Sequence, residues 1–455
     1  MSSIQLRSHR SEDLELPRSR DTSEAEERED AGSGTYSLTA SPPTRKKQAL
    51  VLLSTFFMFF QTIGINQSYG IFQEYYTTPS TTPLPLSQAK NLAAVAFVGT
   101  LGAGLTWGGS IFINPVVARV KDVRWVTVAG SVMMSVGLVA AGEARSLWQL
   151  YLTQSLCYGL GSSMLYFPMV SMAPEYFDRH RGAAMGFILS GAGCGGLVLS
   201  PITRLLLDTV GLRWTLRLLG LLTLAVTLPI SFSASWRFGR PQGRTRVNVS
   251  LARKPTFILQ SLAALLQASG NFVPLTFLTT FSTTLGYSSA FAAVLLALNN
   301  GVNTVSRILL GALADVIGRQ NMIVVGMLGS AGCVWGLWLT AAAGGGKAVW
   351  VAFVIGYGMM AGGYNALLPT VIAEIYGIQA YSSVNGFVYF VRGIGAFFGS
   401  PVGGAILDSS SSSGKPSEYM NVIIYDGALL LGASLCVMGV RFFDAAEKGR
   451  WKLKA

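Results

Sequence analysis

A series of apolar stretches, each about 20 residues long, constrains this chain more than any other feature. A helix rises about 1.5 Å per residue, so such a stretch matches the roughly 30 Å hydrocarbon core of a bilayer. The sequence therefore predicts an all-α polytopic membrane protein with twelve transmembrane helices. The twelve stretches are 48–72, 91–113, 123–143, 148–173, 182–206, 213–235, 255–284, 289–310, 321–343, 347–371, 382–406 and 421–443.

Polar segments divide the chain into five parts. Residues 1–44 are rich in charged residues, Ser, Thr and Pro and poor in aliphatic residues, which predicts a disordered cytosolic N-terminal tail. The first six stretches make an N-terminal bundle at 45–235, and the second six make a C-terminal bundle at 255–443. A basic cytosolic linker at 236–254 separates the two bundles, and residues 444–455 form a cytosolic C-terminal tail.

The two sets of six stretches contain an internal repeat with an offset of about 200 residues. Ser200-Pro201 recurs as Ser400-Pro401, and Asp208 recurs as Asp408. The shared offset predicts two pseudo-symmetric six-helix bundles, related by an axis along the membrane normal. This is the architecture of a rocking secondary transporter.

The chain carries a net charge of +12, from 34 Lys and Arg against 22 Asp and Glu. Most of these basic residues lie in the linker 236–254 and in the connections on the same side as both termini. Cytoplasmic loops of membrane proteins carry an excess of Lys and Arg. The pattern predicts a multi-pass protein of the cell membrane with both termini in the cytosol. The positive balance then reflects topology and not binding to nucleic acid.

Patterns for catalysis or metal binding are not found in the sequence. The two histidines, His9 and His180, have no plausible nucleophile beside them. The four cysteines lie singly in separate apolar stretches, which fits neither a disulfide framework nor a metal site. No phosphate-binding loop is present. We expect that the protein is not an enzyme, needs no cofactor, and draws its energy from an ion or substrate gradient.

A polar stripe marks the stretch 289–310. Asn299, Asn303 and Arg307 recur at every fourth residue, so on a helix they share one face. A charged side chain inside a spanning helix costs roughly 2.5–3.5 kcal/mol or more, and it normally faces a cavity or a partner. Arg307 either bridges two helices or binds an anion.

Arg392 is the second arginine inside a predicted span, and it lies in the second half with Arg307. Two cations without an acidic counter-ion at their depth favour a negatively charged or acceptor-rich ligand. For Arg392, hydrogen bonds to backbone carbonyls between helices are the alternative. The carboxylates in or beside the stretches lie near stretch ends, at Glu143, Glu175, Glu374 and Asp426. The side chains that complete an amphipathic pocket, or else only pack helices together, are Tyr166, Phe167, Asn271, Tyr364, Asn365 and Tyr389.

Residues 311–319 read Gly311-x-Leu313-x-Asp315-x-x-Gly318-Arg319 and resemble the loop signature of the major facilitator superfamily. Glycines permit a tight turn, and the aspartate can cap a neighbouring helix or pair with a basic residue on the inner face. The resemblance implies the major facilitator fold and a gating role for this turn, with an ordinary capped helix turn as the alternative. The residues expected to gate are Gly311, Asp315, Gly318, Arg319 and Arg181.

Residues 176–195 resemble the fifth-helix signature of the monocarboxylate porter family, and the likeness covers nearly the whole chain from about residue 48, closest to the fungal branch. By this resemblance Arg307 meets the substrate carboxylate. Asn303 stands where animal members carry an aspartate linked to proton coupling, and Asn66 or Gln67 stands where they carry a lysine. Asn303, Asn66 and Gln67 therefore join the expected substrate contacts. Their identities depart from the pattern for small-monocarboxylate/proton symport.

These observations predict a fungal transporter of the plasma membrane that moves an organic acid or acidic secondary metabolite by alternating access, as an efflux pump and as a monomer. Its ligand is a small organic anion or an amphipathic metabolite, its other partner is the lipid bilayer, and protons are a candidate coupling ion. Uptake of a monocarboxylate or a vitamin-like anion is the alternative within transport. A transporter-like nutrient sensor is the alternative from another class.

Overall fold

The computed structural model describes residues 44–172, 176–177, 181–234, 249–410 and 415–449. Nearly all of the predicted N-terminal tail and most of the predicted linker lie outside these ranges. Within them, the regular structure is helical throughout, as the apolar stretches predict.

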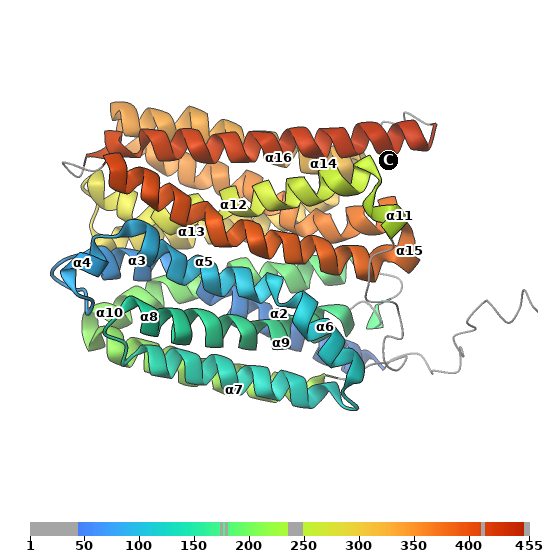
Figure 1. The fold of residues 1–455 in the computed structure, drawn as a ribbon, viewed down its shortest axis with the longest axis horizontal. Coiled ribbons are helices and arrows are strands. Elements are labelled where there is room, and N and C mark those ends of the chain that lie inside the picture. The colour runs from blue at the N-terminus through green and yellow to red at the C-terminus, as the bar shows by residue number, and fades with distance from the viewer. Residues whose placement is uncertain (1–43, 173–175, 178–180, 235–248, 411–414, 450–455) are drawn as a thin grey trace, which may run out of the picture. The chain divides into compact units, whose positions relative to one another are not determined.

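The helices of the first half run back and forth between the two ends of the described bundle (Figure 1). In chain order they are α2 (Arg45–Gln67), α3 (Tyr69–Thr77), α4 (Leu86–Ala89), α5 (Leu92–Gly108), α6 (Ser110–Arg119), α7 (Val123–Ala141), α8 (Leu147–Leu150), α9 (Tyr158–Met172) and α10 (Arg181–Ser233). A π-helical segment, Tyr151–Cys157, joins α8 to α9. The long α10 is two helices that meet at Gly211, whose φ is 75°.

The second half repeats this arrangement. Its helices are α11 (Val249–Ala252), α12 (Pro255–Thr284), α13 (Ser289–Ile317), α14 (Arg319–Cys333), α15 (Gly346–Ser410) and α16 (Met420–Glu447). Two π-helical segments, Val334–Trp338 and Ala341–Gly345, continue α14. The long α15 is again two helices, which meet at Gly377 with a φ of 75°. A 3-10 turn, Pro416–Tyr419, precedes α16.

Nine helical stretches of the described residues are long and apolar enough to cross a membrane. Two of them, of 50 and 59 residues, are each two spans joined by a tight bend, and residues 147–172 run alongside as a further span. The described chain therefore contains the twelve spans that the sequence predicts. Several run past their predicted bounds, because polar residues such as Arg45 and Glu447 continue the helix beyond the apolar stretch.

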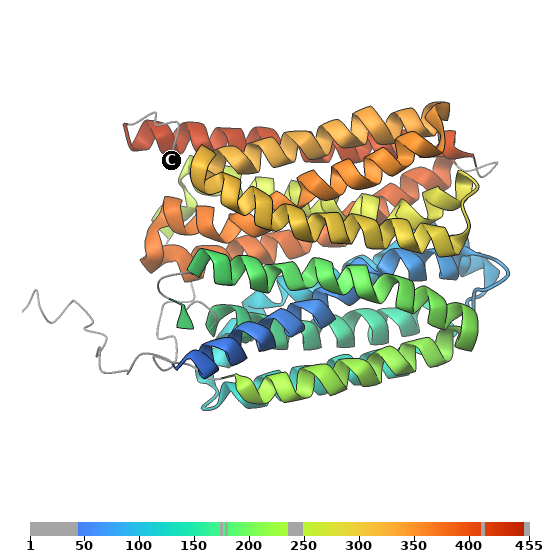
Figure 2. The ribbon, with the colours of Figure 1, turned by 180° about the vertical axis from the view of Figure 1, so that it is seen from behind.

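The helices of each half lie together, the first half in the lower part of Figure 1 and the second half in the upper part, and Figure 2 shows the same division from behind. We call the end with the start of α2 and the end of α16 the terminal face. The opposite end, with the connections 78–91, 142–146 and 285–288, is the distal face.

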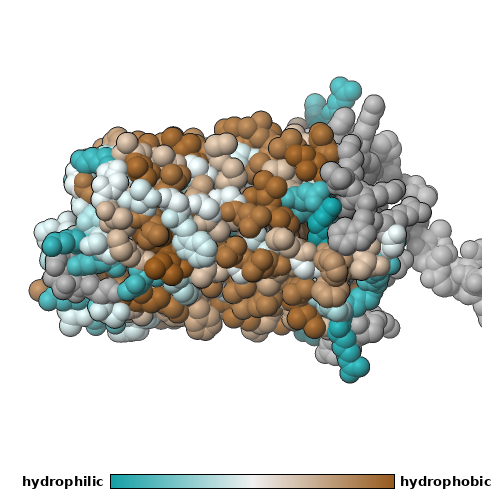
Figure 3. Space-filling model, turned by 90° about the horizontal axis from the view of Figure 1, so that it is seen from above, coloured by the Kyte–Doolittle hydropathy of each residue, from teal (hydrophilic) through white to brown (hydrophobic). Residues whose placement is uncertain are grey.

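Large apolar side chains remain exposed on the outside of the bundle, among them Phe112, Trp125 and Leu205. Figure 3 shows apolar residues over much of the side surface and hydrophilic residues toward the two ends. A surface of this kind suits contact with lipid rather than with water. The fold is that of a multi-pass membrane protein.

Candidate functional site

A cavity lies between the two halves of the bundle. Its empty volume is about 750 Å³, counting space that opens to solvent. First-half helices α2, α5, α9 and α10 and second-half helices α12, α13 and α15 all contribute to its wall. The structure brings together in this wall all seven residues predicted to contact substrate. These are Asn66, Gln67, Tyr166, Asn303, Arg307, Asn365 and Arg392.

The polar stripe of α13 faces this cavity and docks onto α15. Asn299 Nδ2 donates to the carbonyl of Val354 at 2.8 Å, and Asn303 Nδ2 donates to the carbonyl of Gly358 at 3.4 Å. Each bond joins residues 55 apart, so α13 and this part of α15 stay in register over a full turn. Asn303 Oδ1 has no hydrogen-bond partner among the described residues, so it can accept from a ligand.

Arg307 continues the stripe, but it reaches across to the other half. Its Nη1 donates to the backbone carbonyl of Leu189 in α10 at 2.7 Å, and the side chain is buried. Its Nε has no partner. The helix-bridging alternative therefore describes this conformation, while the guanidinium still lines the cavity.

Arg392 is held by amide oxygens and aromatic rings. Its Nη2 donates to Gln267 Oε1 at 3.1 Å and also to Asn365 Oδ1. The guanidinium carbon lies 4.5 Å from the ring centroid of Trp107, which belongs to the first half, and 5.4 Å from that of Tyr389. Ring faces attract a desolvated cation. These hydrogen-bond acceptors are side-chain oxygens, so the predicted alternative of backbone carbonyls is not what this arrangement uses.

The cavity wall is positive and amphipathic. Among the described residues that line it, the charged ones are Arg307 and Arg392, and none is an Asp or Glu. Its apolar part includes Phe59, Trp107 and Phe272. Trp107 and Tyr357 line the cavity although the sequence does not single them out, since an aromatic residue in an apolar helix looks like ordinary packing. Conversely, Phe167 and Tyr364 lie outside the lining.

An aromatic layer closes the cavity toward the terminal face. Tyr166 and Phe167 of α9 pack against Tyr389 of α15, with ring centroids 6.3 and 6.5 Å apart. Because α9 belongs to the first half and α15 to the second, the two halves meet in this layer.

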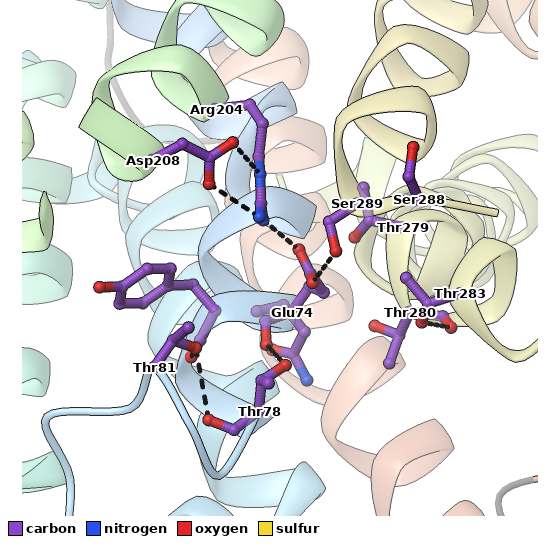
Figure 4. A network of polar contacts seen from close by, with 12 residues as sticks. Glu74, Thr78, Thr81, Arg204, Asp208, Thr279, Thr280, Thr283, Ser288 and Ser289 are labelled. Carbon is purple, nitrogen blue, oxygen red and sulfur yellow. Dashed lines mark hydrogen bonds and ion pairs between the residues drawn. The ribbon is translucent and has the colours of Figure 1, made fainter. Parts of the chain in front are cut away.

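A polar network closes the distal side (Figure 4). The carboxylate of Glu74, at the end of α3, accepts from Arg204 Nη1 at 2.8 Å and from the hydroxyl of Ser289 at 2.7 Å. Arg204 also forms an ion pair with Asp208, at 2.9 Å, one turn along α10. Ser289 is the first residue of α13, so the network joins the two halves.

A second contact between the halves lies at the same end. The carboxylate of Asp408 accepts from the backbone N–H groups of Leu92 and Ala93, the first residues of α5, at 3.3 and 3.4 Å. Such a carboxylate satisfies N–H groups that have no partner inside the helix. The hydroxyl of Thr279 also donates to the carbonyl of Gly70 at 2.6 Å. Asp208 and Asp408, which the sequence pairs as repeat positions, thus both take part in distal contacts.

The turn predicted to gate the transporter lies at the terminal face. The sequence predicts a tight turn that opens at Gly311, but residues up to Ile317 continue α13 and the chain turns only at Gly318. Gly318 has a φ of 103°, which a residue with a side chain rarely adopts. Arg319 Nη1 lies 3.8 Å from Glu374 Oε2. The side chains of Asp315 and Arg181 lie outside the described part of the structure.

Comparison with known proteins gives the same fold. Residues 49–400 match the family model of the Major Facilitator Superfamily. The MFS-type transporter pynF of Aspergillus niger is 27% identical over 97% of this chain and 99% of its own length. The agnestins efflux protein of Paecilomyces divaricatus is 26% identical, over 90% of this chain and 92% of its own length.

Among solved structures, a bacterial homologue of the human lysosomal transporter Spinster, in an inward-facing and unoccupied conformation, matches with a TM-score of 0.64. It is 16% identical and the match covers 90% of this chain and 100% of that chain, so the likeness shows the fold alone. The predicted fold class, two pseudo-symmetric six-helix bundles, is confirmed. The chain therefore belongs to the Major Facilitator Superfamily.

Proposed function

We propose that this protein exports an acidic secondary metabolite across the cell membrane by alternating access. The observation that carries the proposal is the cavity between the halves, which presents Arg307 and Arg392 without a lining carboxylate. A guanidinium holds a carboxylate through parallel charge-assisted hydrogen bonds, and aromatic walls bury the carbon skeleton. The direction of transport rests on the likeness to the agnestins efflux protein.

In this mechanism Arg307 is the primary contact of the ligand anion. In the present conformation it donates to a neutral acceptor, the carbonyl of Leu189 in the other half. A carboxylate is a stronger acceptor than a neutral carbonyl, so an anionic ligand displaces this contact. Binding of the anion then loosens one bond between the halves. Asn303 and Asn365 contribute amide groups beside the two arginines.

Alternating access follows from two sets of contacts between the halves. Opening toward the distal face breaks the bonds of Glu74 to Ser289 and of Asp408 to the start of α5. Opening toward the terminal face parts Tyr166 and Phe167 from Tyr389. A ligand drives the exchange only by binding the two states with different affinity. The turn at Gly318 and Arg319 is the proposed gate at the terminal face.

The terminal face is the proposed cytosolic side. The two proposed bundles are residues 45–235 and 255–443, and the protein works as a monomer. Within the superfamily we assign the chain to the fungal branch of the monocarboxylate porter family. Asn303, Asn66 and Gln67 stand where animal members carry an aspartate and a lysine. These replacements fit a pocket retuned from small acids to bulkier ones.

The proposal is tested by flux into proteoliposomes under an imposed ion gradient. A panel of aromatic and bulky aliphatic carboxylic acids is compared with their neutral methyl esters. We expect transport of at least one acid and at least tenfold less of its ester. Equal flux of acid and ester contradicts anion recognition. Net transport toward the proposed cytosolic side favours uptake instead of export. Binding of an acid without any flux favours a sensor.

A further inference from the structure

One buried carboxylate has no role in the mechanism above. Among the described residues, Glu74, Asp426 and Asp444 are the acidic residues that are buried. Glu74 accepts from an arginine and a serine, and Asp444 accepts from Gln320 Nε2 at 2.9 Å and pairs with a lysine of its own helix. Asp426 has an exposure of 0%, and neither of its oxygens has a hydrogen-bond partner in the described part of the chain.

The depth of Asp426 differs from the prediction. The sequence places it near the end of a stretch, and the structure buries it completely, with Gly270 of α12 beside it. A Cβ atom on Gly270 would lie 3.2 Å from Asp426 Oδ1. Glycine thus leaves the space that the carboxyl group occupies.

The groups around Asp426 are neutral. Its titratable neighbours are the phenols of Tyr357, on α15, and of Tyr425, on its own helix. The π-helical segment Val334–Trp338 presents Trp335, whose indole donates to the backbone of the preceding turn of α16. Cys333, at the end of α14, lies near Tyr357, and α12 offers glycine rather than a charged group.

Asp426 lies directly behind the cavity wall. Gly270 precedes Asn271, and Asn271 lines the cavity together with Tyr357. The hydroxyl of Tyr357 donates to the backbone carbonyl of Asn271 at 3.4 Å. One phenol and one turn of α12 therefore separate this carboxyl group from the site proposed for the ligand.

An ionised carboxylate in this setting would cost several kcal/mol, because no donor or cation among the described residues offsets its lost hydration. The neutral acid costs much less, so in this conformation the carboxyl group holds a proton. Rocking that admits water to α12 and α16 allows it to ionise. Occupancy by a proton then differs between conformations, which is what coupling requires.

We propose that Asp426 is the proton-binding site through which a proton gradient drives this transporter. The coupling role rests on the proposed function, whereas proton binding itself does not. In each cycle one proton adds to the carboxylate oxygen in the conformation open to one face and leaves from it in the conformation open to the other. Apart from that O–H bond, no covalent bond changes.

The first test measures the proton directly. Infrared difference spectra of the reconstituted full chain, taken between acidic and alkaline pH, report the carbonyl band of protonated carboxyl groups. We expect one such band to disappear in Asp426→Asn and to remain, shifted, in Asp426→Glu. Glu447→Gln, an exposed carboxylate at the other end of α16, is the matched control and should retain the band. An unchanged band in Asp426→Asn overturns the proposal.

The second test measures coupling without a ligand. Spin labels at Ser80→Cys and Ser417→Cys, one in each half at the distal face, report opening in a background with the four native cysteines replaced by serine. We expect the distance distribution to shift with pH in the parent and in Glu447→Gln, and the shift to be lost in Asp426→Asn. A retained shift in Asp426→Asn means that the carboxyl group is only structural. If Asp426→Asn loses the shift but the protein shows no anion flux in any assay, the proton site stands and the proposed function is rejected.

Discussion

The side-chain oxygens of Ser68 and Ser200 form a hydrogen bond of 3.0 Å between the kink that follows α2 and the middle of α10. Thr276 and Ser400 form a bond of the same length between α12 and α15. Ser200 and Ser400 are equivalent positions of the internal repeat. Both repeat positions therefore use their hydroxyl in a buried contact with another helical segment of the same half.

We expect Ser200→Ala and Ser400→Ala to destabilise the protein equally. Each removes one buried hydrogen bond and leaves its partner oxygen with one hydrogen-bond partner fewer, a loss of about 1 kcal/mol. Thermal unfolding in detergent, followed by intrinsic fluorescence, measures the two variants side by side. If only one variant loses stability, Ser200 and Ser400 do not contribute equally to the stability of their halves.

Arg307→Lys should be nearly as damaging to ligand binding as Arg307→Gln. An ammonium group cannot reproduce the two parallel hydrogen bonds of a guanidinium. Loss of a desolvated charged partner costs about 2–5 kcal/mol, which is well over tenfold in affinity. The measurement is ligand affinity in detergent, on protein that elutes as a single monodisperse peak. Folded Arg307→Gln protein with unchanged affinity leaves only the bridge to Leu189 as the role of this residue.

Glu74→Gln should favour the state that is open at the distal face. The change weakens the bond from Ser289, which is the contact that crosses between the halves, and it removes the charge that positions Glu74 beside Arg204. A contact of this kind contributes about 1–3 kcal/mol, so the balance between the two states shifts about 5- to 150-fold. Labelling of Leu275→Cys, in the cavity wall, by a reagent that cannot cross the membrane measures the opening.

The matched control for that experiment is Glu143→Gln. Glu143 pairs with Arg213 at 2.7 Å, but both side chains are exposed and belong to the first half. The hydrogen bond from Arg213 lowers the pKa of Glu143, so the pair is ionised at neutral pH. Exposed pairs contribute little to stability, and labelling should not change. Equal labelling of both variants would falsify the distal gate.

Asp315→Asn should leave the protein in the membrane and able to bind its ligand, while net transport falls strongly. The reason is a charge contact that the gating turn makes in only one of the two states. Surface expression, ligand affinity and flux are compared in one preparation. Normal flux at normal expression rules out a gating role for this turn. The Asp315 side chain itself is outside the described part of the structure.

The proposed orientation predicts which cysteine substitutions are labelled from outside intact cells. Ser80→Cys and Ser417→Cys, at the distal face, should react with an impermeant reagent. Ser23→Cys should react only after permeabilisation, because the tail is predicted to be cytosolic. Labelling of Ser23→Cys in intact cells reverses the orientation.

The spans and the cavity residues could be predicted because their signals are local. Helix length, a charge inside an apolar stretch and the spacing of Asn303 and Arg307 are all read within one segment. The distal contacts could not be predicted in this way. Glu74 meets Arg204 across 130 residues, and Asp408 meets Leu92 across 316. No local pattern marks such pairs.

The depth of Asp426 was beyond sequence reasoning for a related physical reason. Distance from the end of a helix says nothing of the neighbours that cover a side chain, and here a glycine on another helix is one of those neighbours. The turn after α13 illustrates the reverse error. The sequence predicts a tight turn that opens at Gly311, but helix hydrogen bonding continues to Ile317 and the helix ends only at Gly318.

Both arginines of the cavity belong to the second half, whereas the first half contributes uncharged residues. Some are apolar, such as Phe59 and Leu189, and others are polar, namely Asn66, Gln67 and Tyr166. Recognition of charge and accommodation of shape are thus divided between two walls. We expect substitutions confined to the first-half wall to change which carbon skeleton fits while the grip on the acid group stays intact. A duplicated scaffold of this kind can change the substrates it carries through a few substitutions in one wall, while the other wall stays unchanged.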